Sequence, residues 1–151
     1  NAAIGTPTSV KGAANTRIAS FTLTAGSGEA VTVTQIVVKN NATTGQGLGS
    51  DFQNLILKNG STMLGTTIGS LQTAASNTYT FTPSPSISIA AGQQYVVDVY
   101  ADSLTVATNT SVAYSAVILD SVPLQVNPLI PPLVMALIKL VRISTSLLQA
   151  H

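Results

Sequence analysis

Few side chains in this sequence are of a type and spacing that could carry out chemistry. Asp98 and Asp102 lie four residues apart near the end of a predicted strand, and paired carboxylates can serve hydrolysis or bind calcium. Calcium loops supply several oxygen ligands from one short run, and the chain has no Asp-x-Asp-x-Asp motif. The one histidine, His151, stands at the end of the sequence, where fraying is expected. We therefore interpret both carboxylates as isolated surface groups, with Asp98 hydrogen-bonded at a sheet edge, and predict that the protein is not an enzyme.

Composition removes further classes of function. The chain has no cysteine, which excludes disulfides, thiolate metal sites and cysteine nucleophiles. Binding to a phosphate backbone needs a basic patch, so we expect no nucleic-acid partner, because the six cationic residues are scattered. They are Lys11, Arg17, Lys39, Lys58, Lys139 and Arg142. We predict neither a metal site nor a cofactor.

Charge is scarce along the whole chain. Charged residues make up 7% of its 151 residues, against about 25% in typical soluble domains, and the net charge is +1. Ser, Thr, Asn, Gln and Gly must supply the polar surface, and they suit strands and turns better than helices. Such a surface repels its own copies only weakly, which favours self-association. The length fits one ordinary domain.

Most of the chain up to Ser121 predicts short β-strands. Apolar and polar residues alternate with a period of two, which is typical of half-buried strands. The alternating stretches are residues 17–24, 31–38, 52–58, 62–68, 78–82, 86–89, 95–101 and 112–119. Turn signals separate them, among them Asn59-Gly60, which suits a type I′ hairpin. This pattern favours an all-β, two-sheet antiparallel sandwich, with a closed barrel as the competing architecture.

Polar features of these strands and loops permit some binding functions. The glycine-rich stretch 40–50 predicts an exposed, mobile loop. Alternating threonines at 22–24, 32–34 and 78–82 could form a flat ice-binding or polysaccharide-binding face, although any solvent-facing strand rich in Thr has this spacing. Trp is absent and the four tyrosines lie in predicted strands, so an aromatic sugar platform has little support. Glycosylation sequons, which predict surface exposure, occur at Asn41, Asn59 and Asn109.

Four stretches between about Lys11 and Asp102 carry a resemblance to a known class of protein. They are Ile18 to Gly26, Glu29 to Ile36, Leu55 to Thr66 and Ile87 to Gln93. Together they resemble the immunoglobulin-like repeats of large bacterial surface proteins. The resemblance implies a strand, a turn with an acidic residue, a hairpin, and a final strand introduced by an Ala-Gly turn. It implies a structural role at the cell surface and indicates no binding site.

The segment 123–151 differs in composition from the predicted sandwich domain, residues 1–122. Acidic residues are absent from it, and Leu, Ile and Val dominate. From Pro132 onward the polar spacing slightly favours an amphipathic helix, while its β-branched residues leave a strand open. Lys139 and Arg142 would lie well inside a membrane-spanning window, so we expect no transmembrane span.

This surplus apolar surface leads to a prediction of assembly. Soluble monomers seldom expose large contiguous apolar patches, so a partner must cover the segment from Pro128 to Leu148. The predicted assembly residues are Leu133, Leu137, Ile138, Leu140 and Val141. Deletion from Pro128 onward is expected to leave a folded but monomeric sandwich.

The sequence thus predicts a non-catalytic extracellular or cell-surface structural protein. It would self-assemble into a surface layer or filament, with its own copies or neighbouring surface modules as partners. The first residue is Asn1, and no basic stretch with an apolar core follows, which fits a mature product whose signal peptide has been removed. The alternative is an adhesin or carbohydrate-binding module, whose partner would be a glycan.

Overall fold

The computed structural model describes residues 10–40, 47–74 and 77–106 in full, together with the backbone of four strands in the C-terminal part of the chain. Within these residues the regular structure is β, apart from one short 3-10 helix, η1. The elements are, in chain order, β1 (Thr16–Thr24), β2 (Val31–Val33), β3 (Ile36–Asn40), η1 (Leu48–Ser50), β4 (Phe52–Asn59), β5 (Thr62–Met63), β6 (Thr78–Phe81), β7 (Ile87–Ile89), β8 (Gln94–Ser103), β9 (Ser111–Val112), β10 (Val117–Ser121), β11 (Leu124–Val126) and β12 (Leu148–Gln149).

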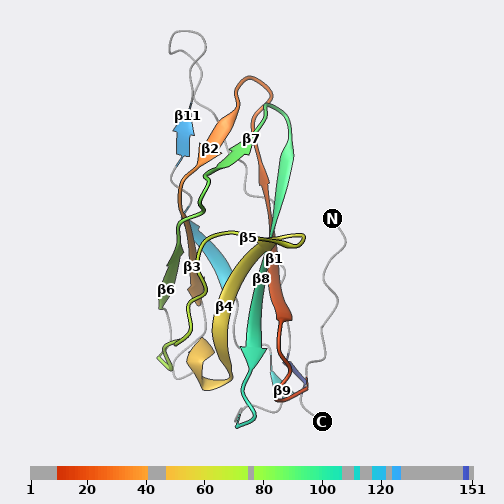
Figure 1. Ribbon diagram of the computed structural model, residues 1–151, viewed down its shortest axis with the longest axis vertical. Coiled ribbons are helices and arrows are strands. Elements are labelled where there is room, and N and C mark those ends of the chain that lie inside the picture. Colours follow the sequence, from red (N-terminus) through yellow and green to blue (C-terminus); the bar gives the residue numbers. More distant parts are fainter. Residues whose placement is uncertain are drawn as a thin grey trace.

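The strands form antiparallel sheets in two layers. One layer is a four-stranded sheet in the order β1-β8-β4-β5. The other consists of two three-stranded sheets, β10-β3-β6 and β11-β2-β7, which lie end to end because β2 leads into β3 after two residues and β7 follows β6 (Figure 1). β9 and β12 pair with each other. The predicted all-β, antiparallel fold is confirmed.

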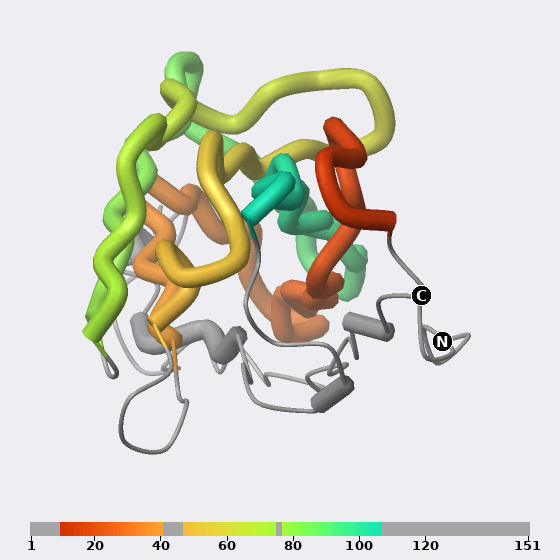
Figure 2. Tube along the Cα trace, turned by 90° about the horizontal axis from the view of Figure 1, so that it is seen from below, coloured from red at the N-terminus to blue at the C-terminus, as the bar shows by residue number. Residues whose placement is uncertain are grey.

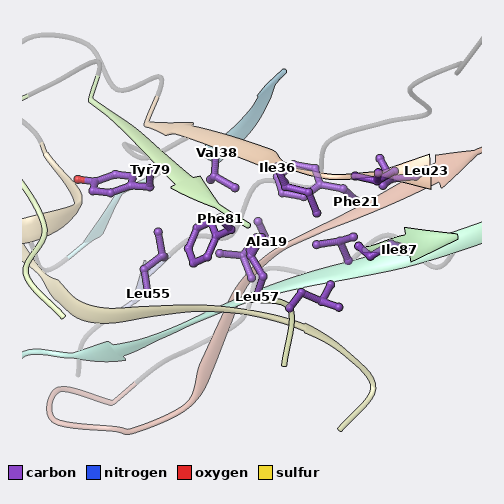
Figure 3. Packing of buried hydrophobic residues seen from close by; sticks show 14 of the residues in the cluster. Ala19, Phe21, Leu23, Ile36, Val38, Leu55, Leu57, Tyr79, Phe81 and Ile87 are labelled. Atoms are coloured by element: carbon purple, nitrogen blue, oxygen red, sulfur yellow. The ribbon is translucent and has the colours of Figure 1, made fainter. Parts of the chain in front are cut away.

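The hydrophobic core lies between the two layers. Ile36 of β3 and Phe81 of β6 come from one layer, and Ala19 of β1 with Leu55 and Leu57 of β4 come from the other (Figure 3). Among the residues with described side chains, the buried hydrophobic ones run from Ile18 to Ala101, and each is at most 5% exposed. Burial of a large side chain of this kind contributes roughly 1.5–3 kcal/mol, so this shared interior is the main force that holds the layers together.

The period of two in the sequence correctly predicts which side chains enter this core. Phe21 and Leu23 of β1 are buried, as are Tyr79 and Phe81 of β6. On β8, the inward set of Val97, Val99 and Ala101 alternates with an outward set of Val96, Asp98 and Tyr100. The alternation that predicts these strands is therefore confirmed by the burial of the inward set.

The predicted hairpin after β4 differs from expectation in its turn and its length. Asn59 pairs with Thr62, so the two loop residues are Gly60 and Ser61. Only Gly60 has positive φ, at 58°, which is the pattern of a type II′ turn and not of the predicted type I′. The predicted return strand 62–68 is regular only at β5, and later meets β4 through the single bridge between Leu55 and Ile68.

The prediction that the glycine-rich stretch 40–50 is exposed and mobile is partly wrong. Residues 41–46 lie outside the described residues, but Leu48 is only 1% exposed. The amides of Gly47 and Gly49 donate to the carbonyls of Thr73 and Gln72, each at 2.9 Å. A Cβ atom on Gly49 would overlap the carbonyl of Leu71, so this glycine permits a close backbone approach. The segment that it meets comes from the arch that crosses one side of the molecule after β5 (Figure 2).

The C-terminal part of the chain contributes backbone pairing to both small sheets. β11 pairs with β2, with Leu124 opposite Val33, so pairing in this layer continues beyond the predicted boundary at residue 122. That boundary stays a prediction. The predicted assembly residues Leu133, Leu137, Ile138, Leu140 and Val141 lie outside the described residues. In the described part of the chain, no helix has the length and apolar character needed to cross a membrane.

Candidate functional site

Charged side chains gather on the outer face of the four-stranded sheet. Of the eight charged residues with described side chains, four lie on this face: Arg17 on β1, Lys58 on β4, and Asp98 and Asp102 on β8. The sheet order places β8 between the other two strands, so its outward carboxylates meet cations from both sides. We call these four residues, with Asn15, Asn54 and Tyr100, the polar cluster.

Asp102 is the most strongly bonded member of the polar cluster. Its Oδ1 accepts a hydrogen bond from the backbone N–H of Asn15, and its Oδ2 accepts one from Nδ2 of Asn54, each at 2.8 Å. The Asn54 hydrogen bond, then the Asn15 hydrogen bond and the positive charge of Lys58, hold the pKa of Asp102 below its ordinary value of 3.8. Asp102 is thus an ionised carboxylate that joins three segments of chain.

The two asparagines occupy backbone conformations that few other residues tolerate. Asn15 has a φ of 51° and Asn54 a φ of 54°, in the left-handed region where Asn is among the better-tolerated residues. Asn54 lies in a register shift between Gln53 and Ile56, and its own N–H donates to Gly69 at 3.1 Å instead of to β8. This β-bulge turns the Asn54 amide toward Asp102.

Lys58 joins the other half of the polar cluster. Its Nζ donates to Oδ1 of Asn15 at 3.3 Å and lies 4.8 Å from the ring centroid of Tyr100, which is within the range of a cation–π contact. Its cross-strand partner is Asp98, whose Oδ1 lies 3.7 Å from Nη1 of Arg17. That separation makes an ion pair without a hydrogen bond, and with Arg17 half-exposed the pair contributes about 0–1 kcal/mol.

The polar cluster bonds neighbouring strands and segments together. Each oxygen of Asp102 accepts one N–H hydrogen bond from the protein, and Nζ of Lys58 lies over one face of the Tyr100 ring. Among the residues with described side chains, no group of three His, Cys, Asp or Glu residues is placed to hold a metal ion. Opposite charges alternate across the three strands, so the cluster acts as a cross-strand clamp.

The sequence interpretation of these carboxylates needs correction. Asp98 was expected at a sheet edge, but β8 is an interior strand with β1 and β4 as its neighbours. Asp102 was expected to be isolated, yet it accepts two hydrogen bonds. Sequence reasoning also missed Asn15, Asn54 and Lys58. The one available signal was the asparagine inside the stretch 52–58, because Asn is depleted in strands and enriched at positive φ.

Tyrosines do not form a binding platform in the described part of the chain. Tyr79 is buried, and its hydroxyl oxygen accepts a hydrogen bond from the Gln72 N–H at 3.0 Å. Burial raises the pKa of Tyr79 and also that of Tyr95, which packs against the core. Tyr114 lies outside the described side chains. Tyr79 lies on β6, and Tyr95 and Tyr100 belong to opposite faces of β8, so these three tyrosines do not share one surface.

The predicted threonine ranks are divided between the layers. Thr22 and Thr24 lie on β1 in the four-stranded sheet. Thr32 lies on β2, and Thr78 and Thr80 lie on β6, in the other layer. A flat ice-binding or polysaccharide-binding face would need all these ranks on one surface, so the structure does not assemble that face from them.

Comparisons of this chain with protein families, curated proteins and solved structures find no match.

Proposed function

We propose that this protein is a non-catalytic, extracellular structural module that assembles with copies of itself into a surface layer or filament. The observation that carries the proposal is that, among the residues with described side chains, those between 18 and 101 form a closely packed core between the layers. The sequence of segment 128–148 contains many further apolar residues. Apolar surface in excess of what one domain buries is characteristic of protein–protein contact.

The polar cluster supports the non-catalytic part of the proposal. Both oxygens of Asp102 accept hydrogen bonds from the protein itself, so this carboxylate already has a structural role in holding neighbouring segments together. The low charge of the chain supports assembly, because copies approach one another with little electrostatic repulsion.

The same proposal includes an immunoglobulin-like sandwich in the broad sense of two antiparallel layers with crossed connections. Each step along the main strands, from β1 to β2–β3, β4, β6–β7, β8 and β10, changes layer. Constant-type immunoglobulin domains instead keep several consecutive strands in one sheet. The proposed likeness to immunoglobulin domains therefore concerns the two-layer architecture, and the order of strands in this protein differs from theirs.

Light scattering and size-exclusion chromatography over a concentration series test the assembly. In the full chain, Leu133, Leu137, Ile138, Leu140 and Val141 would be replaced together by Ser. We expect the unmodified protein to grow in mass with concentration, and the five-site variant to stay monomeric with an unchanged melting transition.

A matched control uses exposed apolar residues elsewhere. Val10 and Val106 are 72% and 73% exposed, and their replacement by Ser should leave assembly intact. A full-length protein that stays monomeric at every concentration would refute the assembly function. Saturable binding to a glycan array by such a monomer would support the adhesin instead.

A further inference from the structure

The turn between β4 and β5 contains the one Asn-Gly sequence in the chain, Asn59-Gly60. Glycine has no side chain to shield its backbone nitrogen, so this nitrogen can approach the side-chain carbonyl of a preceding asparagine. In the sequence this pair is also a turn signal and part of a glycosylation sequon.

The structure leaves the reacting nitrogen accessible. Gly60 and its neighbour Ser61 are exposed, and nothing lies within 4 Å of the position that a Cβ on Gly60 would occupy. Because Asn59 pairs with Thr62, the Gly60 N–H lies in the loop, outside that pairing. The positive φ of Gly60 also prevents easy replacement by a residue with a side chain.

The Asn59 side chain has a structural task that a chemical change would abolish. Its Nδ2 donates a hydrogen bond of 2.7 Å to the carbonyl oxygen of Val96 on β8. This bond ties the hairpin tip to the central strand of the sheet. A carboxylate at the same place offers no hydrogen to that carbonyl, and the two oxygens would repel each other.

We propose that Asn59 is a site of spontaneous deamidation in the folded protein. The Gly60 nitrogen attacks Cγ of Asn59, a C–N bond forms, the Cγ–Nδ2 bond breaks, and ammonia leaves with the proton of the Gly60 N–H. Water then opens the resulting succinimide at either carbonyl, giving aspartate or isoaspartate. No oxidant, cofactor or enzyme is needed.

The product differs from the original protein in two measurable ways. The formal net charge falls from +1 to zero. Because only 7% of the residues are charged, one added carboxylate is a large relative change in the charge of the chain. The tie to Val96 is lost, so the β4–β5 tip, an edge of its sheet, separates from β8. The modification therefore acts as a slow, irreversible change in the charge and order of one sheet edge.

Peptide mass spectrometry on the full-length protein, incubated at mildly alkaline pH and body temperature, tests the proposal. We expect a gain of about one dalton at Asn59 before any change at Asn54 or Asn77, neither of which precedes glycine. Isoelectric focusing should show an acidic band in step with it. The variant Asn59→Gln should not produce that band, and the variant Asn59→Asp should exchange its hairpin amides faster than the unmodified protein.

A synthetic peptide covering residues 55–64 provides the reference rate. Conversion at Asn59 in the folded protein supports the proposal. The conversion can be slower than in the peptide, because the hydrogen bond to Val96 restrains the Asn59 side chain. The proposal is overturned if the peptide converts completely while the folded chain shows no change at Asn59. It is also overturned if Asn59 converts no faster than Asn54 and Asn77.

Discussion

Replacing Asp102 by alanine tests whether the polar cluster acts as a clamp. The substitution removes the acceptor of two 2.8 Å hydrogen bonds, from the Asn15 N–H and from Asn54 Nδ2. Hydrogen bonds to a charged group contribute about 1.5–3 kcal/mol each. We take the lower end of this range for the Asn54 bond, which is partly buried, and a smaller value for the Asn15 bond, which is exposed. The expected loss is about 2 kcal/mol in the free energy of unfolding near neutral pH.

The pH dependence of this loss has a definite sign. The pKa of Asp102 is lower in the folded protein than its ordinary value of 3.8, so the folded state favours the ionised form. Its contribution to stability is complete above the unfolded pKa and disappears as the pH falls through the folded pKa. The difference in stability between the original protein and Asp102→Ala should therefore shrink as the pH drops below 3.8.

Urea unfolding at a series of pH values measures both effects, with one pair of control variants. Asn54→Gly keeps positive φ accessible but removes the amide donor, so it should reproduce part of the Asp102→Ala loss. Asn15→Gly keeps the backbone N–H that donates to Asp102. In a protein that carries Asn15→Gly, Asp102→Ala should therefore lower the free energy of unfolding by nearly as much as in the original protein. A loss at Asp102 that is negligible near neutral pH, or that does not change with pH, would refute the clamp.

Three further substitutions test the packing. Gly49→Ala places a Cβ against the Leu71 carbonyl and should cost about 3 kcal/mol or more in thermal or urea unfolding, whereas Gly28→Ala, with nothing within 4 Å of its Cβ, should cost little. Phe81→Ala empties a site that is 1% exposed and should lower the free energy of unfolding by about 3–5 kcal/mol. Tyr79→Phe removes the hydroxyl that accepts a backbone N–H and should cost about 1 kcal/mol, and an unchanged urea midpoint would contradict that bond.

Local alternation made much of the fold predictable. The stretches that contain Phe21, Tyr79 and Val97 each place apolar residues at every second position, and a strand against a core is the simplest structure that buries them. The composition, poor in charge and rich in residues that suit strands and turns, also favoured an all-β fold. Neither signal depends on distant parts of the chain, which is why both could be read from one sequence.

The polar cluster could not be predicted because it depends on long-range pairing and on bulges. Asp102 meets Asn15 only because β1 pairs with β8, and local periodicity does not choose between strand partners. A register shift brings Asn54 to the same place, and one extra residue in a strand leaves little trace in an alternating pattern. The prediction of a mobile loop around Gly49 was wrong for a related reason. The sequence does not show whether a glycine provides flexibility or permits a close approach of two backbones.

The pairing of β1 with β8 affects how the chain reaches its folded state. Thr16 pairs with Ala101, so the four-stranded sheet cannot close until most of the described chain exists. Ribosomes add about 5–20 residues per second, so the first strand waits several seconds for its partner with Phe21 and Leu23 uncovered. Sheets built from such distant pairs fold slowly, because loop closure precedes the contacts that reward it. We therefore expect a nascent chain that stops short of β8 to be unfolded and prone to aggregation.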